Sequence, residues 1–215
     1  MTQPEAGPLA VLRRIRRPPS PPRPGEACDL CGAVIGERHG HLVDVQDRRL
    51  LCACRACALL FDGQGAGGLR FRAVPDRRVA LGAAGLTPAE WDALDIPVGI
   101  AFVFFNSVLG QAVACYPGPA GATEHTLPDG AWARLVGAHR ALDALAPDVE
   151  ALLVRDVRGS PACFIVPIDA CYELVGELRR CWRGFDGGSE AHARLDAFFD
   201  ELGARATGPQ VPARG

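Results

Sequence analysis

The 215-residue sequence contains no lysine, so arginine supplies every basic side chain other than histidine. The formal net charge is only −2, which provides no global field for capturing nucleic acid or acidic lipid. No apolar run approaches the length of a membrane-spanning helix, since the longest, residues 98–105, has eight residues. The N-terminus also lacks the apolar stretch of a secretory signal. Together these absences predict a soluble, cytoplasmic protein.

Cysteine is abundant instead: the chain has nine, and five of them lie between Cys28 and Cys57. A disulfide framework is typical of short secreted chains, so clustered cysteines in a cytoplasmic protein indicate metal or redox chemistry. The other four are scattered over predicted strands and a predicted helix face, which favours inert packing. These four are Cys115, Cys163, Cys171 and Cys181.

Composition divides the chain into five segments. Residues 1–25 are a Pro/Arg-rich tail that cannot bury enough apolar surface to order itself. Residues 26–62 form a cysteine-rich metal-binding module, and a Gly-rich hinge follows at 63–68. The main domain is expected over residues 69–205, with a disordered tail at 206–215.

The main domain is predicted to have an α+β fold, an antiparallel sheet with helices on one face. Short turns make hairpins of two strand pairs, and residues 121–126 are interpreted as a loop. Strands are predicted at 69–74, 100–108, 111–116, 149–157 and 162–168. Helices are predicted near 87–94, over 130–145, around 171–182 and from about 189 to 202.

The metal module contains two Cys-x-x-Cys pairs separated by a predicted two-stranded hairpin. Two such pairs can point four thiolates at one ion in tetrahedral geometry, which suits Zn²⁺ or a single iron. The four predicted ligands are Cys28, Cys31, Cys54 and Cys57. The second pair opens into a predicted helix, which resembles a treble clef more than a flat zinc ribbon.

Three further residues of the module have open roles. Cys52 can replace Cys54 as a ligand, extend the site to a cluster, act as a redox thiol, or be a buried strand residue. His39 and His41 share a face, where they can bind the metal, hydrogen-bond a thiolate, or lie at the hairpin edge. A zinc ion closed by four thiolates has no open position, which argues against metal-dependent hydrolysis.

Outside the module the sequence shows no catalytic constellation. His139 is interpreted as a core histidine on a helix face, and His125 can pair with Glu124 but has no nearby nucleophile. A helix end before a Gly-rich turn carries a basic and aromatic group, which is typical of binding hot spots and also of an ordinary helix terminus. This candidate partner-binding group is Arg179, Arg180, Trp182 and Arg183.

Several strings resemble an uncharacterised actinobacterial family whose members are encoded beside high-affinity [NiFe]-hydrogenase genes. The resemblance covers roughly residues 26–202 and includes Cys28-Asp-Leu-Cys-Gly, His41-Leu-Val-Asp, Leu51-Cys-Ala-Cys-Arg-Ala-Cys, Pro147-Asp-Val-Glu-Ala-Leu-Leu-Val, Ile168-Asp-Ala-Cys-Tyr-Glu-Leu-Val-Gly and Trp182-Arg-Gly-Phe-Asp-Gly-Gly. It implies an accessory role in assembling or electrically connecting a hydrogenase, with hydrogenase subunits or maturation factors as partners. It carries no catalytic residue over to this chain.

These observations leave four functional hypotheses. The first is a non-catalytic, zinc-stabilised accessory or docking protein. The second is an electron-transfer protein with a rubredoxin-like iron or an iron–sulfur cluster in the same cysteines. The third is a nucleic-acid-binding zinc module with Arg48, Arg49 and Arg55 near the cysteine pairs, which the net charge of −2 disfavours. The fourth is a thiol–disulfide enzyme.

Overall fold

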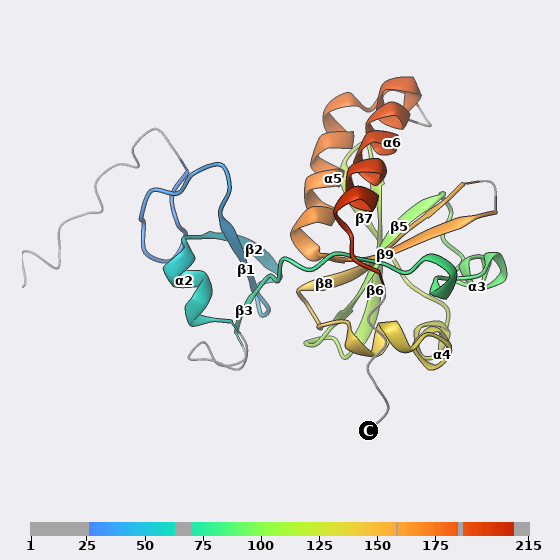
Figure 1. Ribbon diagram of the computed structural model, residues 1–215, viewed down its shortest axis with the longest axis horizontal. Helices are drawn as coiled ribbons and strands as arrows, with labels where there is room; N and C mark the ends of the chain where they lie inside the picture. The colour runs from blue at the N-terminus through green and yellow to red at the C-terminus, as the bar shows by residue number, and fades with distance from the viewer. Residues whose placement is uncertain (1–25, 63–69, 158, 185–186, 209–215) are drawn as a thin grey trace, which may run out of the picture.

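The structure, a computed structural model, describes residues 26–62, 70–157, 159–184 and 187–208. The predicted N-terminal tail and Gly-rich hinge lie outside the described residues, as does the predicted C-terminal tail from residue 209 onward. Figure 1 shows a small N-terminal module beside a larger domain. Among the described residues, none of the helices combines the length and hydropathy that crossing a bilayer requires.

The N-terminal module is a three-stranded antiparallel sheet with one helix, in the strand order β2-β1-β3. The strands are β1 (Gly40–Asp44), β2 (Arg49–Ala53) and β3 (Phe71–Ala73), and helix α2 spans Arg55–Leu60. Leu42, Leu51 and Ala53 lie on one face of the sheet and pack with Cys28 and Cys57. The structure therefore confirms the predicted hairpin and the predicted helix that begins at the second cysteine pair.

The third strand corrects the predicted domain boundary. We expected residues 69–74 to open the main domain, but β3 pairs with β1, with Leu42 opposite Ala73. The Phe71 ring contacts the Phe61 ring at 5.4 Å between centroids, inside the core of the module. A two-stranded hairpin is marginal alone, and this third strand completes the sheet. The module therefore extends past the predicted hinge to Ala73.

The larger domain contains a six-stranded antiparallel sheet in the order β4-β9-β8-β5-β6-β7. Its strands are β4 (Val79–Ala80), β5 (Ile100–Asn106), β6 (Gln111–Gly118), β7 (Gly121–His125), β8 (Glu150–Asp156) and β9 (Pro161–Pro167). The two predicted hairpins are confirmed as β5–β6 and β8–β9. The predicted loop at 121–126 is wrong, because pairing with β6 makes a strand of a segment without apolar alternation.

Helices cover both faces of this sheet, so the prediction of helices on one face is wrong. One face carries α5 (Ile168–Cys181) and α6 (Gly188–Arg205). The other carries α3 (Pro88–Asp92), α4 (Ala131–Ala138) and the 3₁₀ turns at Gly82–Ala84 and Arg140–Ala144.

The central strand β8 gives the physical reason for this second helical layer. Ala151 and Leu153 pack in the cluster that contains α5 and α6, whereas Leu152 and Val154 pack in the cluster that contains α3 and α4. All four side chains are fully buried. A strand that reads as a continuous apolar run needs cover on both faces.

Two predicted boundaries also change. The helix predicted over 130–145 ends at Ala138, because His139 adopts an extended conformation before a 3₁₀ turn. The predicted C-terminal tail begins with paired backbone: the N–H of Thr207 donates to the Arg78 carbonyl at 3.0 Å, and Ala80 donates to the Thr207 carbonyl at 2.9 Å. Thr207 therefore forms a parallel bridge with Val79 at the β4 edge of the large sheet.

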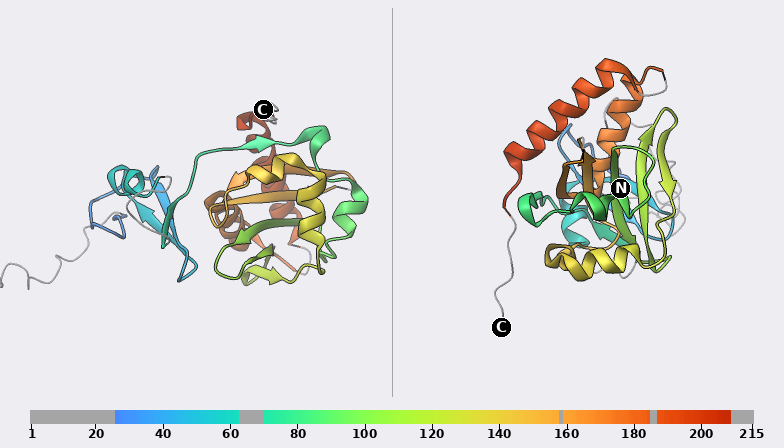
Figure 2. Two further views of the ribbon diagram at one scale, coloured as in Figure 1. Left: turned by 90° about the horizontal axis from the view of Figure 1, so that it is seen from below. Right: turned by 90° about the vertical axis from the view of Figure 1, so that its right-hand side faces the viewer.

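One of the hydrophobic clusters contains residues of both the module and the larger domain. Val43 and Val45 belong to the same buried cluster as Val149 and Ile168 of the larger domain. In Figure 2 the segment between β3 and β4 crosses from the module to the larger domain. The module is thus packed against the larger domain through one face of its sheet, while Cys28, Cys57 and α2 lie with the other face.

Candidate metal centre and the surfaces around it

The structure brings together the sulfurs of the four cysteines that the spacing singled out. Their Sγ atoms all lie within 4.8 Å of one another, and the group is Cys28, Cys31, Cys54 and Cys57. The first pair lies in a tight turn, where Gly32 has φ +72° and its N–H donates to the Cys28 carbonyl at 2.8 Å. Only glycine adopts this left-handed conformation without strain. The second pair lies at the start of α2, with Cys54 as its N-cap.

Backbone groups around the sulfurs favour the thiolate form. Burial alone would raise the pKa of the Cys28 thiol, but N–H groups of Cys54, Cys31 and Leu30 lower it to about 6. The Cys57 N–H also donates to the Cys54 sulfur at 3.4 Å.

Crowding of the sulfurs acts in the opposite direction on the Cys57 thiol. Hydrogen bonds from the Cys57 thiol to the sulfurs of Cys54 and Cys31 raise the pKa of Cys57 to about 12. The group therefore ionises readily at one position, and further thiolates need a cation to neutralise them. Soft sulfur donors converging on one point are a donor set that fits a metal ion.

The four cysteines differ in exposure. Cys28 and Cys57 are buried in the core of the module, Cys54 is half-buried and Cys31 is exposed. The Cys31 and Cys54 sulfurs lie 3.7 Å apart at the outer side of the group. A metal ion at this point would be anchored from inside the module and would lie close to its surface.

Cys52 lies apart from this group. We expected Cys52 and Cys54 to share a strand face, but β2 ends at Ala53 and Cys54 caps α2. Cys52 instead groups with His39 and His41, with one donor atom of each residue within 4.8 Å of the others. Burial raises the pKa of the Cys52 thiol, and the carboxylates of nearby acidic residues add to this.

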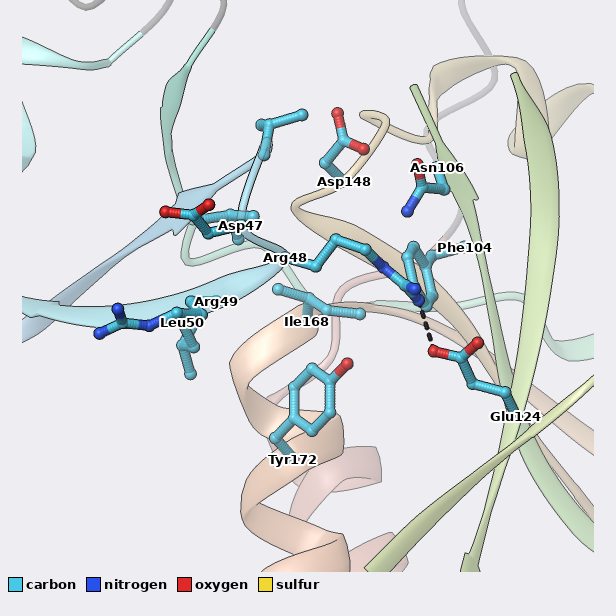
Figure 3. A pocket seen from close by; sticks show the side chains of 12 residues that line it. Asp47, Arg48, Arg49, Leu50, Phe104, Asn106, Glu124, Asp148, Ile168 and Tyr172 are labelled. Atoms are coloured by element: carbon cyan, nitrogen blue, oxygen red, sulfur yellow. Dashed lines mark hydrogen bonds and ion pairs between the residues drawn. The ribbon is translucent and has the colours of Figure 1, made fainter. Parts of the chain in front are cut away.

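A cavity of about 360 Å³ lies between the β1–β2 turn and the larger domain. Figure 3 shows Arg48 extending from that turn toward Glu124, with which its guanidinium forms an ion pair. The sequence suggested that Glu124 pairs with His125. In the structure Glu124 instead pairs with Arg48 across the interface between the module and the larger domain. Buried Asp148 accepts the Ser107 N–H at 2.8 Å through Oδ1, and its Oδ2 forms an ion pair with Arg72 Nη1 at 3.3 Å. The cavity is part of the contact between the module and the domain.

The predicted partner-binding group lies at the C-terminal end of α5. Arg179 and Arg180 are exposed in the last turn, where cations complement the helix dipole. Trp182 is half-buried against the core and donates its indole N–H to the Gly184 carbonyl at 3.1 Å. These contacts give Trp182 a structural role, and binding of a partner by it or by exposed Arg183 stays a prediction.

His139 and His192 have hydrogen-bond partners within the protein, whereas the buried Nε2 of His125 has none in the described structure. His139 Nδ1 lies 3.0 Å from the Ala84 carbonyl, and its Nε2 lies 2.9 Å from Glu90 Oε1. It therefore ties α4 to α3. His192 Nδ1 lies 2.7 Å from the Gly188 carbonyl on its own helix.

The scattered cysteines are packing residues in the larger domain. Burial raises the pKa of Cys115 to about 12 and also raises the pKa of Cys163 and Cys171. Cys181 directs its sulfur to the Glu177 carbonyl at 3.4 Å. Buried thiols with raised pKa values are poor nucleophiles and poor redox thiols.

Residues 27–206 match a family described as "Family of unknown function (DUF5947)". This match spans more than half of the chain and includes both the cysteine module and the larger domain. No curated protein matches the chain, and no solved structure matches it.

Proposed function

The chain belongs to this family of unknown function, and we propose that it is a non-catalytic, zinc-stabilised docking protein that acts in the cytoplasm. The observation that carries this proposal is the convergence of four cysteine sulfurs within 4.8 Å. Four thiolates satisfy the tetrahedral preference of Zn²⁺ and leave no position for a reacting water. The ion would then hold the fold of the module together and perform no chemistry itself.

The arrangement of the module supports the treble-clef interpretation. A cysteine turn, an antiparallel hairpin and a helix that begins at the second cysteine pair follow one another along the chain. The core of the module is small, so metal binding would supply much of its folding free energy.

The outer surface of the module supports docking. Four apolar side chains near the metal ligands are exposed: Leu30 by 38%, Val34 by 64%, Leu59 by 60% and Leu60 by 56%. Leu59 and Leu60 lie on α2, which packs on the sheet face opposite to the one that contacts the larger domain. A group of exposed apolar side chains is typical of a protein-binding surface.

A hydrogenase complex is the partner that the sequence resemblance supports. The motifs resemble those of an actinobacterial family encoded beside high-affinity [NiFe]-hydrogenase genes, and on this resemblance we propose a role in hydrogenase maturation or assembly. In this proposal the module presents its apolar surface to a hydrogenase subunit or maturation factor.

Electron transfer is the alternative, and the exposure of Cys31 favours it. A single iron in the same four sulfurs would be rubredoxin-like, with one ligand at the surface that would face a redox partner. The same fold and the same four cysteines suit both docking and electron transfer, so the identity of the bound metal distinguishes these two functions.

Metal analysis of protein purified without oxygen tests the choice of metal. We expect a colourless protein with one tightly held zinc ion per four-cysteine group. A red or brown protein that contains iron would overturn the zinc proposal in favour of electron transfer.

Docking is tested by co-purification with identified hydrogenase subunits. The Leu59→Asp/Leu60→Asp double variant should lose these subunits while it retains zinc. The matched control is Val108→Asp/Leu109→Asp, which alters two exposed apolar residues in the β5–β6 turn, 58% and 49% exposed, and should retain them. Equal retention by both variants would remove α2 from the interface, and absence of hydrogenase subunits from the wild-type complex would overturn the proposed partner.

A further inference from the structure

A second group of metal-binding side chains lies on the module, apart from the four cysteines. His41 of β1 is directly opposite Cys52 of β2, and His39 lies two residues before His41 on the same side. One donor atom from each of these three residues lies within 4.8 Å of the others. The two imidazole rings have their centroids 4.8 Å apart.

Each histidine has one ring nitrogen committed to an oxygen. His41 Nδ1 lies 2.8 Å from Asp169 Oδ2, and His39 Nδ1 lies 2.8 Å from the Gly36 carbonyl oxygen. A carbonyl oxygen only accepts, so His39 Nδ1 carries the hydrogen. A neutral imidazole with a protonated Nδ1 has a free lone pair on Nε2, and this holds for His41 when its Nδ1 donates to the carboxylate.

The Nε2 atom of His39 is buried and has no hydrogen-bond partner in the described structure. The His39 side chain is only 9% exposed, so water does not readily replace the missing partner. A buried polar atom without a partner is unfavourable and calls for an explanation. Packing alone explains the burial of the His39 ring but not why its Nδ1 is held while its buried Nε2 has no partner in the described structure.

Metal-binding histidines show this pattern. They usually donate the second ring N–H to a carboxylate or a backbone carbonyl, which fixes the ring and makes the other nitrogen more basic. Here both kinds of partner are present, Asp169 for His41 and Gly36 for His39. Asp169 is itself held, because its Oδ1 accepts the Ala170 N–H at 2.8 Å.

We propose that His39, His41 and Cys52 form a second metal site that binds a divalent transition-metal ion of the zinc type. Two imidazole nitrogens and one thiolate suit such borderline ions and not Mg²⁺ or Ca²⁺, which prefer oxygen ligands. Asp169 is a positioning residue of this site, since it holds His41 from the larger domain.

The second site differs from the four-cysteine group in having an open position. Three protein ligands leave a fourth tetrahedral position for water or for one donor atom of an exogenous ligand. His39 and His41 line a groove of about 1240 Å³ between the module and the larger domain, which gives such a ligand access. We therefore expect an ion in this site to exchange with solution, whereas the four-cysteine group should retain its ion. This inference goes beyond docking and uses none of the four cysteines.

Metal stoichiometry of the full chain tests the second site. Anaerobic protein is treated with a chelator that removes exchangeable ions, the retained metal is counted, and Co²⁺ is then titrated while its absorption is recorded. The wild type should bind one further equivalent of Co²⁺, with the absorption of a site that contains a single thiolate. Cys52→Ser and His39→Gln should each lose this equivalent and keep the retained ion.

Matched controls separate the site from general effects of mutation. Cys181→Ser removes another half-buried thiol, and His192→Gln removes an exposed histidine outside the site; both variants should bind the further equivalent as the wild type does. Asp169→Asn should keep the stoichiometry and weaken the affinity by about 10- to 100-fold. Circular dichroism identifies any variant that has lost its fold. If one of the ligand variants Cys52→Ser and His39→Gln is unfolded, the Co²⁺ uptake of the other one tests the site.

Two outcomes would overturn the proposal: a wild type that takes up no further Co²⁺, or a folded Cys52→Ser variant that takes up as much as the wild type. The docking proposal fails differently, through iron in the retained site or through hydrogenase subunits that do not bind. Neither of those results changes the number of exchangeable ions.

Discussion

His41 Nδ1 lies 2.8 Å from Asp169 Oδ2, although the two residues are 128 positions apart in the chain. The contact joins β1 of the module to the first turn of α5, and each side chain is 24% exposed. It lies beside the shared core in which Val43 of the module meets Ile168 of the larger domain. The module is therefore held to the domain by a polar contact next to an apolar one.

Loss of this polar contact should loosen the module. We expect Asp169→Ala to destabilise the protein by about 1–2 kcal/mol, because it removes a hydrogen bond to a charged group at a half-buried position. The rate of amide hydrogen exchange in β1 should also be higher in Asp169→Ala than in the wild type. Asp196→Ala is the control, since Asp196 is 63% exposed in its pair with Arg155 and should cost at most about 1 kcal/mol. Equal effects of the two variants would show that the contact does not hold the module.

Two adjacent arginines should differ sharply in their contribution to stability. Arg77 donates to both oxygens of Glu150, at 2.8 and 2.6 Å, and the Glu150 side chain is only 2% exposed. Arg77→Ala would leave this carboxylate buried without its cation, at a cost of about 3 kcal/mol.

Arg78 is the internal control for this comparison. It pairs with Asp76, whose side chain is 88% exposed, so Arg78→Ala should change the free energy of unfolding by about 0–1 kcal/mol. Urea denaturation of both variants measures the difference. A similar small effect of both substitutions would mean that water reaches Glu150 once Arg77 is removed.

Local patterns in the sequence were sufficient for the cysteine group and the hairpins. Cys-x-x-Cys spacing and strand alternation both act over a few residues, so the four sulfurs and the β5–β6 and β8–β9 pairs could be predicted. The short β3 has no such signal for its sheet, because Phe71 could pack in either core. Its membership of the module depends on pairing with β1 after the Gly-rich segment.

Cys52 shows that local sequence patterns are also insufficient for the candidate sites. Its position two residues before Cys54 suggested a common direction, which the start of α2 at Arg55 removes. The partner that orients His41 comes from α5, far along the chain, so no local spacing could have indicated Asp169. Local spacing can indicate which residues lie on the same face of an element. It cannot indicate which distant part of the chain packs against that face.

The Asp44–Arg70 pair predicts a specific pH dependence. Asp44 accepts hydrogen bonds from Arg70 Nη2 at 2.8 Å and Nε at 3.0 Å, and this guanidinium lowers the pKa of the Asp44 carboxyl below its ordinary value of 3.8. A carboxyl with a lowered pKa in the folded state contributes stability above its unfolded pKa and loses that contribution as the pH falls through the folded value.

Asp44→Asn should therefore be less stable than the wild type by a constant amount between pH 5 and 8, because Asp44 stays ionised over that whole range. The difference should begin to shrink only below about pH 3.8. Urea denaturation of the zinc-loaded proteins across the neutral range measures it. A difference that narrows already between pH 7 and 5 would show that the Asp44 pKa is raised and not lowered.

The turn between β1 and β2 offers a test of backbone strain against an ion pair. Arg48 has φ +52°, a left-handed conformation that glycine adopts freely and other residues do not. Its ion pair with Glu124 joins side chains that are 41% and 57% exposed, so the pair should contribute only about 0–1 kcal/mol. Arg48→Ala loses the pair and keeps the strain, whereas Arg48→Gly loses the pair and relieves the strain.

We therefore expect Arg48→Gly to be more stable than Arg48→Ala by about 1 kcal/mol, and close to the wild type. Chemical denaturation of the three metal-loaded proteins measures the order. Gly110, which has φ +66° in the β5–β6 turn, provides the reverse control, because Gly110→Ala should destabilise through backbone strain alone. If Arg48→Ala and Arg48→Gly are equally destabilised, the Arg48–Glu124 contact and not the turn conformation determines the stability of this interface.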